Sequence, residues 1–279
     1  MLKRVLTFLL LALTSWSMPV LPARAQLQDT ERFAGRILAQ NKADVSNAIA
    51  SIVTEIHFVP GQRVQEGDLL FSLDATEFEL ALSTERANVL SAEATLKSAR
   101  DDFERLKQLQ ERGSATGVQV LKAEVAQAFA DSVRAETQAK LKGALIDLER
   151  TQIRAPISGV ISAPQVSIGT YVKKGRDALA TIVQLDPVRV EFQVPYVERI
   201  DELDLENLHF PDSLLERIQV SLELTDTWTY PEKTTPTHVS ATVDPVSGAL
   251  TLWAEMPNPR GQLRPGMEVT VISRTRPAK

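Results

Sequence analysis

Cysteine is absent from this 279-residue sequence, and aromatic residues make up only 5% of it. The absence of cysteine excludes a disulfide framework, a thiolate metal site and attachment of a lipid to a cysteine. The low aromatic content predicts a mostly aliphatic core. Such a core suits narrow β-modules and coiled coils better than a large enzyme core.

Histidine and methionine are also scarce. His57, His209 and His238 lie in different segments without H-x-x-x-H spacing, so a zinc site has no ligand set. Beyond the first 25 residues only Met256 and Met267 remain, which argues against handling of a soft metal. No G-x-S-x-G, P-loop or Gly-rich dinucleotide turn is present. We therefore predict a protein that is not an enzyme and that has no cofactor and no metal.

Residues 1–25 have the pattern of a secretory signal peptide. Lys3 and Arg4 precede an apolar run, and Ala23-Arg24-Ala25 is a small-x-small cleavage site. The alternative is an uncleaved anchor, but the apolar stretch is shorter than the ~20 residues that a spanning helix needs. Cleavage would remove three basic and no acidic residues, which moves the net charge from −5 to −8. We expect an acidic mature chain, soluble in the periplasm, that does not bind nucleic acid.

Residues 75–150 contain no proline, and their only glycines are Gly113, Gly117 and Gly143. In the first arm, apolar or small residues recur at coiled-coil spacing, broken only by Glu85. These residues are Phe78, Leu82, Val89, Ala92, Leu96, Ala99, Phe103 and Leu106. In the second arm we expect the seam at Val118, Leu121, Val125, Ala128, Ala135 and Ala139. The pattern predicts an α-helical hairpin over residues 75–150.

The turn of this hairpin is predicted from its capping residues. Gly113 suits the C-terminal cap of the first helix. Thr116 suits the N-terminal cap of the second helix, and Gln119 completes a capping box. Each arm would measure roughly 50 Å at ~1.5 Å per residue, so the hairpin must project from the rest of the molecule.

A short motif occurs on both sides of the hairpin. Gly61–Gly67 and Gly169–Gly175 both read G-x-x-V-x-x-G, and each precedes an apolar strand, at 69–73 and 178–185. Glycines around a β-branched residue are typical of a tight turn beside a strand. Two copies that flank a helical insertion predict two half-motifs, which pair into one small β-sandwich.

The pattern of residues 187–274 predicts a series of short strands. Residues 188–194 alternate between apolar and polar, and similar strands are expected at 239–243, 249–255 and 267–273. Turn residues occur at 244–248 and 264–266. A first strand at 33–39 would complete a small β-barrel or sandwich.

The predicted fold class is therefore α+β and elongated. The hairpin, residues 75–150, is inserted in a split sandwich formed by residues 42–74 and 151–186. The barrel comprises residues 26–41 and 187–274, and residues 275–279 form a tail.

These motifs, in this order, resemble the periplasmic adaptors (membrane fusion proteins, HlyD family) of RND-type tripartite efflux systems. The repeats resemble the two halves of the family's lipoyl-like domain, and residues 153–159 match the entry to the second half. Residues 242–248, 256–259 and 263–267 match the last strands of its β-barrel. The match covers residues 33–274.

The resemblance implies partners and a docking site. The family's hairpin tip carries an arginine, a leucine and a serine that dock onto a TolC-like outer-membrane channel, a spacing kept here by Arg105, Leu109 and Thr116. The alternatives are a simple N-cap for Thr116 and a solvated helix face for Arg105. The resemblance further implies an inner-membrane RND transporter as partner and self-association into a ring, a hexamer in the family.

Two departures from the family pattern are expected. The membrane-proximal domain that usually follows the barrel is missing or vestigial, and neither a lipid nor a membrane anchor is indicated. Three alternatives remain: an adaptor for an ABC or major-facilitator exporter, a periplasmic tether without a transport role, and a lipoyl or biotin carrier with Lys173 or Lys174 as acceptor.

Overall fold

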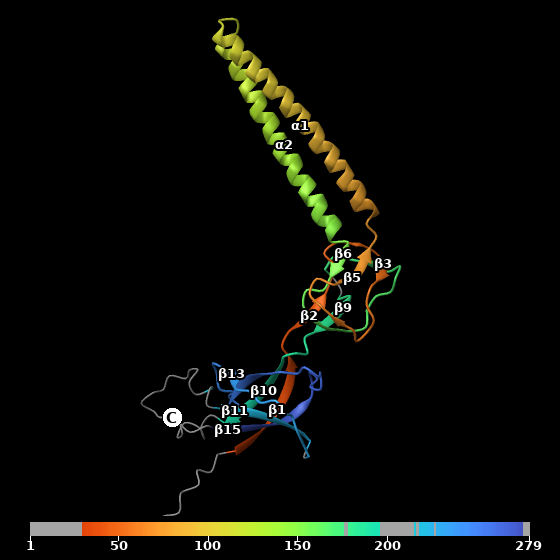
Figure 1. Ribbon diagram of the computed structural model, residues 1–279, viewed down its shortest axis with the longest axis vertical. Helices are drawn as coiled ribbons and strands as arrows, with labels where there is room; N and C mark the ends of the chain where they lie inside the picture. The colour runs from red at the N-terminus through yellow and green to blue at the C-terminus, as the bar shows by residue number, and fades with distance from the viewer. Residues whose placement is uncertain (1–29, 176–177, 196–214, 216–217, 226, 276–279) are drawn as a thin grey trace, which may run out of the picture.

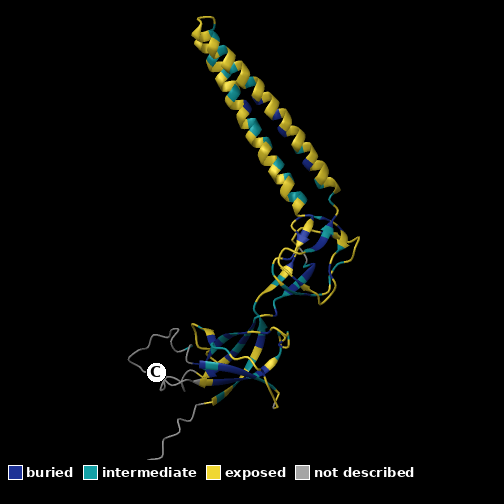
Figure 2. Ribbon diagram, in the orientation of Figure 1, coloured by how far each residue is buried: buried dark blue, intermediate teal, exposed yellow. Residues whose placement is uncertain are grey.

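The computed structural model describes residues 30–175, 178–195, 215, 218–225 and 227–275. Three units follow one another along an elongated molecule: a helical hairpin, a small β-sandwich and a β-barrel (Figure 1). Most residues of the hairpin are exposed, whereas the other two units have buried interiors (Figure 2). The expected α+β architecture is therefore confirmed.

The hairpin consists of α1 (Thr76–Glu111) and α2 (Gly117–Glu149). In α1, the expected seam is confirmed: Leu82, Val89, Ala92 and Leu96 are buried against α2. Their alternating steps of seven, three and four residues keep one face toward the partner helix. The remaining seam positions, toward the two ends, are half-buried.

In α2, the predicted seam is wrong. Val118, Leu121 and Val125 are about three-fifths exposed, and Ala128, Ala135 and Ala139 are exposed as well. The helix carries a second apolar series, in which Ala130 is buried and Val120, Ala123 and Val133 are half-buried. This second series packs against α1.

The β-sandwich is built from both halves of the split domain. One sheet has the order β2-β9-β7-β4, and the other has the order β6-β5-β3-β8. The strands before the hairpin are β2 (Lys42–Val45), β3 (Ser51–Ile56), β4 (Arg63–Val64) and β5 (Leu69–Leu73). Those after it are β6 (Gln152–Arg154), β7 (Gly159–Ile161), β8 (Tyr171–Val172) and β9 (Ala180–Val183). Each sheet therefore contains two strands from either half, so neither half forms a complete sheet alone.

The repeated glycine motif performs the predicted role in both halves. Gly61, Gly67, Gly169 and Gly175 all have positive φ, which other residues rarely adopt. The valine between each pair, Val64 or Val172, is buried in the sandwich core. Each motif is thus a turn around one short strand, β4 or β8.

The barrel is one seven-stranded sheet with the order β12-β11-β15-β1-β10-β14-β13. Its strands are β1 (Thr30–Ala39), β10 (Val188–Pro195), β11 (Ile218–Thr225), β12 (Trp228–Thr229), β13 (Pro236–Val239), β14 (Ala249–Met256) and β15 (Glu268–Thr275). In β10, alternate residues Val188, Val190, Phe192 and Val194 are buried as predicted. The first strand of the barrel comes from before the sandwich, also as predicted, and pairs with both β10 and β15.

Two features of the barrel differ from the prediction. The strand expected at 239–243 lies instead at 236–239, because residues 240–248 form the turn before β14. Strands β11 and β12 were not predicted at all. An isolated pairing of Val220 with Thr234 connects β11 to the segment before β13, so the two sides of the sheet approach each other.

Two chain crossings join the barrel to the sandwich, and Asn258 reinforces the junction. Its buried side chain donates to the carbonyl oxygens of Leu185 and Leu263 at 2.7 and 2.8 Å, and its Oδ1 accepts from the Leu263 amide. The Asp186 carboxylate accepts from the Asn258 amide at 2.8 Å. These bonds tie the second crossing directly to the barrel.

Some predictions lie outside the described residues. They concern the signal peptide at 1–25, nearly all of the tail at 275–279, and His209. Among the described residues, neither long helix has a stretch apolar enough to cross a membrane.

Candidate functional site

The far end of the hairpin closes with a tight turn after α1. The Ser114 amide donates to the Leu109 carbonyl at 2.8 Å, and the Gly113 amide donates to the Gln110 carbonyl at 2.9 Å. Gly113 has φ of 75°, so this pair of bonds forms a Schellman motif with glycine in the left-handed position. The predicted glycine cap is confirmed.

The start of α2 is held by the predicted capping box. The Gln119 amide donates to the Thr116 hydroxyl at 3.3 Å, and the Thr116 amide donates to the Gln119 side-chain oxygen at 2.8 Å. Thr116 itself is extended, with φ of −86° and ψ of 154°. Both helix ends at the tip are therefore capped, which makes the short turn between them a defined surface.

The three residues predicted to dock lie within this end of the hairpin. Arg105 is exposed on α1 and forms an ion pair with Asp102, one helical turn before it. Leu109 is half-buried beside the turn, and Thr116 is exposed at the cap. The Thr116 side chain has a structural role as a cap, and its exposure leaves it accessible to a partner as well.

A shallow groove of about 530 Å³ runs between the helices just below the tip. Arg105 and Asp102 of α1 line it together with Gln119 and Lys122 of α2, and Ala99, Ala123 and Ala126 contribute small side chains. The groove places Arg105 beside the capping box. Leu109 and Thr116 do not line it, and they lie closer to the turn.

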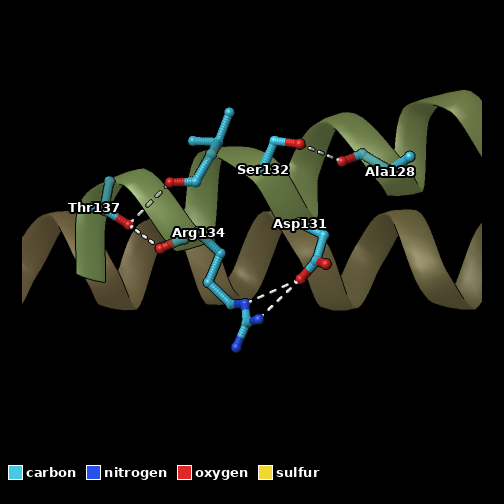
Figure 3. Close-up of polar contacts among 6 residues, drawn as sticks. Ala128, Asp131, Ser132, Arg134 and Thr137 are labelled. Carbon is cyan, nitrogen blue, oxygen red and sulfur yellow. Dashed lines mark hydrogen bonds and ion pairs between the residues drawn. The ribbon is translucent and has the colours of Figure 1, made fainter. Parts of the chain in front are cut away.

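Ion pairs between exposed or half-buried side chains accompany the helices further from the tip. Asp131 and Arg134 pair at 3.0 Å on the side of α2 that faces α1, whereas Ser132 lies on the opposite side (Figure 3). A hydrogen bond from Lys140 and its positive charge lower the pKa of the Glu136 carboxyl. Exposed pairs of this kind contribute little to stability, so the caps and the seam hold the hairpin together.

The other end of the hairpin is held by an aspartate from the sandwich. The Asp74 carboxylate accepts from both the hydroxyl and the amide of Thr76, at 2.7 and 3.0 Å. These two hydrogen bonds lower the pKa of Asp74 because they stabilise its ionised form. The first turn of α1 is thereby attached to the strand that precedes it.

Within the described part of the chain, no three His, Asp or Glu side chains gather closely enough to hold a metal ion. The tip combines a cation, a half-buried leucine and a hydroxyl on a rigid support. Such an arrangement can make a protein contact through charge, apolar surface and hydrogen bonding.

Two family models together match most of the chain. The barrel-sandwich hybrid domain of RND membrane fusion proteins matches residues 41–184. The β-barrel domain of the same proteins matches residues 187–274. The first match alone covers more than half of the sequence and includes the whole hairpin. The chain belongs to the RND membrane fusion protein family.

The relatives include a linker protein of an efflux pump and a multidrug resistance protein. The chain is 34% identical to the antibiotic efflux pump periplasmic linker protein ArpA of Pseudomonas putida, over 86% of this chain and 62% of that protein. It is 26% identical to the multidrug resistance protein MdtE of Escherichia coli K12, over 85% and 62% of the two chains. This membrane fusion protein thus spans about three-fifths of the length of these curated relatives.

Solved structures share the fold at lower identity. The membrane fusion protein Spr0693 of Streptococcus pneumoniae R6 matches with a TM-score of 0.65 and 15% identity, over 88% of this chain and all of that one. A MacA–MexA chimera with the Pseudomonas aeruginosa MexA hairpin matches with a TM-score of 0.58 and 20% identity, over 91% and 81%.

One surface of this membrane fusion protein was not anticipated. The heptad series that we assigned to the interior of the hairpin forms an exposed apolar face on α2. The signal was present in the sequence, because α2 carries two apolar series and a single partner helix covers only one of them.

Proposed function

We propose that the protein is a non-catalytic periplasmic adaptor, which links an inner-membrane RND transporter to a TolC-like outer-membrane channel. The observation that carries this proposal is the hairpin, which projects from the sandwich and ends in a turn capped on both sides. The relatives that are named periplasmic linkers of efflux pumps support it.

Docking onto the channel is assigned to Arg105, Leu109 and Thr116. The exposed Arg105 guanidinium can pair with a carboxylate, and Thr116 can donate its hydroxyl while it continues to cap α2. Because the turn is already ordered, little conformational entropy is lost when a partner binds. A purely structural role, with Thr116 as a cap and Arg105 solvated, is compatible with docking. The experiment below separates the two roles.

Assembly of several copies into a ring, a hexamer in the family, would surround a duct between the two membranes. The hairpins would meet the channel at one end, and the barrel would face the transporter at the other. The protein would act after signal-peptide cleavage as a soluble periplasmic chain, held at the inner membrane through the transporter. The exported substrates would be selected by that transporter.

Two other functions lead to distinct results. An adaptor for an ABC or major-facilitator exporter would co-purify with a transporter of that class. A carrier would bear biotin or lipoate on Lys173 or Lys174, which intact-mass spectrometry would detect. Against a carrier, the two half-motifs are joined by the long hairpin, and residues 173–174 belong to the glycine turn of the second half.

The adaptor function is tested with Arg105→Asp in a strain that lacks the native copy. We expect loss of drug resistance to the level of the deletion strain, because the substitution reverses the charge at the proposed contact. Stability should change by only about 0.5 kcal/mol, since the Arg105–Asp102 pair is exposed. Far-UV circular dichroism and the melting temperature should therefore match those of the unsubstituted protein.

Arg134→Asp is the matched control. It breaks the same kind of pair, with an aspartate three residues earlier, but halfway down α2. Resistance should persist in this variant. If Arg105→Asp also retained resistance, the docking assignment would be wrong; if deletion of the gene left susceptibility unchanged, the adaptor function itself would be wrong.

A further inference from the structure

The two copies of the glycine turn differ in the residues that they expose. Both motifs form the same kind of turn, but Arg63 of the first copy corresponds to Tyr171 of the second, and Pro60 corresponds to Ile168. Tyr171 and Ile168 are 60% and 64% exposed. Because the first copy makes its turn without them, neither large apolar side chain is needed for the backbone conformation. Their exposure points to a contact outside the chain.

Ile52 joins these two residues in an edge patch. It pairs with Tyr171 across strands β3 and β8 and is 43% exposed, because Val53 rather than Ile52 faces the core. Ile168 lies in the turn before β8, where the neighbouring Gly169 amide donates to the Val53 carbonyl at 2.8 Å. The edge patch, formed by Ile52, Ile168 and Tyr171, therefore lies beside β8, the last strand of its sheet. Apolar residues gathered in this way mark an interaction site.

A second apolar pair lies on the opposite side of the molecule. Leu145 and Ile146, the base patch, are 44% and 39% exposed near the end of α2. The sheet order β6-β5-β3-β8 places α2, which leads into β6, and the edge patch at opposite edges of one sheet. In Figure 1, α2 and β6 lie on one side, and α1 and β3 lie on the other. The two patches therefore do not meet within one chain.

The two patches lie at nearly the same height along the molecule. The Asp74 amide donates to the Ile52 carbonyl at 2.8 Å. One residue earlier, the Leu73 amide donates to the Thr151 carbonyl at 2.8 Å, so the edge patch is level with the end of α2. Ile146 precedes Thr151 by five residues, which places it roughly 8 Å further along the helix, at ~1.5 Å per residue. A copy displaced sideways would bring its base patch beside the edge patch with little vertical shift.

A second copy of the chain is the partner that this position favours. Ile146 lies 30 residues from Thr116, so the base patch is roughly 45 Å from the tip. The barrel lies beyond the sandwich at the other end (Figure 1). A channel at the tip and a transporter at the barrel are therefore both distant from the patches. Charge agrees with this choice, because exposed Lys173 follows the edge patch and exposed Glu149 follows the base patch, and the two can pair.

We propose that the edge patch of one copy packs against the base patch of the next copy, head to tail. The inference rests on the proposed function, in which several copies stand around one transporter with their tips at one height. Because the two patches differ, the contact repeats from copy to copy, and it closes into a ring when the rotation between copies allows it. The sandwich of one copy would thus support the hairpin base of its neighbour and fix the direction in which that hairpin projects.

The test is disulfide cross-linking in cells with the full-length chain, which has no cysteine of its own. One protein carries Ile168→Cys together with Ile146→Cys, and the control carries Ile168→Cys together with Val118→Cys. Val118 is 63% exposed on the same helix as Ile146 but lies beside the tip, so the control changes the height of the cysteine and not the helix. We expect the first pair to give a ladder of cross-linked multimers on a non-reducing gel. Each cysteine alone, and the control pair, should give none.

The outcomes separate this inference from the proposed function. A cross-linked dimer from Ile168→Cys alone would show that the edge patch meets itself across a two-fold axis, against the inference. An equally strong ladder with the control pair would contradict it as well, because the contact would then not depend on height. The absence of a ladder would overturn the inference, and drug resistance in the same cells would leave the proposed function standing. If the gene confers no resistance, the proposed function fails, whereas the ladder still decides the contact between copies.

Tyr171→Asp provides an independent measurement in the protein with Ile168→Cys and Ile146→Cys. It removes the largest side chain of the edge patch and places an acid opposite the acidic Glu149, so the ladder should weaken about tenfold or more. Val59→Asp is the control, because Val59 is 68% exposed on the same sandwich but lies outside the edge patch. Both positions are exposed, so both variants should fold normally, and circular dichroism checks this directly. A ladder that Tyr171→Asp leaves unchanged would refute the proposed contact.

Discussion

Replacing Asn258 with alanine tests how the barrel is joined to the sandwich. The Asn258 side chain is buried and makes three hydrogen bonds, two to the carbonyl oxygens of Leu185 and Leu263 and one from the Leu263 amide. Each bond contributes about 0.5–1.5 kcal/mol net, and buried partners that are left unpaired add to the loss. We expect Asn258→Ala to lower the free energy of unfolding by about 3 kcal/mol.

Tryptophan fluorescence is a suitable probe for this change. Trp228 and Trp253 both belong to the barrel, so unfolding in urea followed by fluorescence reports on that unit. The helical signal in circular dichroism is dominated by the hairpin and should unfold as in the parent protein. We therefore expect the fluorescence midpoint to fall while the helical midpoint stays the same.

Asn41→Ala is the control for this experiment. Asn41 lies at the same junction, but it is exposed, and its side chain makes one hydrogen bond, to the Gln184 side chain. Its loss should cost about 0.5 kcal/mol. If Asn258→Ala changed the fluorescence midpoint no more than Asn41→Ala does, the three bonds would not stabilise the junction as we have reasoned.

Two further substitutions address the tip and the sandwich. Thr116→Ala should destabilise the start of α2 by about 1 kcal/mol and speed hydrogen exchange at the Gln119 amide. Thr116→Ser keeps the hydroxyl and should exchange as slowly as the parent protein. Equal exchange in the parent protein and both variants would show that the cap is dispensable. Gly159→Ala should destabilise the sandwich by about 1–3 kcal/mol, because a Cβ there would lie 2.5 Å from the Val183 carbonyl oxygen of the neighbouring strand. Gly143→Ala is the control: a Cβ there meets open space, so the substitution should stabilise α2 by about 1 kcal/mol in thermal unfolding. A melting temperature that Gly159→Ala leaves unchanged would refute the clash.

Features that depend on neighbouring residues could be predicted from the sequence. The caps at Gly113 and Thr116 are local, since each is completed within a few residues. The turns around Val64 and Val172 are local for the same reason, because glycines on either side supply the required backbone conformations. The alternation in β10 also identified its buried face, since a strand has only two faces.

The tip residues Arg105, Leu109 and Thr116 were located on the hairpin by sequence, through a resemblance in spacing. The structure adds that Arg105 lines a groove with Gln119, whereas Leu109 and Thr116 lie closer to the turn. Their assignment to docking stays a prediction until Arg105→Asp is tested.

Only the tertiary structure decided which apolar series of α2 is interior. Helical periodicity shows that Val125 and Ala130 belong to different faces, but it does not show which face meets α1. That choice depends on how the side chains of two helices fit together, and in the folded chain it is Ala130 that is buried and Val125 that is exposed. The junction at Asn258 and the strands β11 and β12 depend likewise on partners distant in sequence. The hairpin itself was therefore determined by local sequence, whereas the exposed apolar face of α2 became visible only in the folded chain.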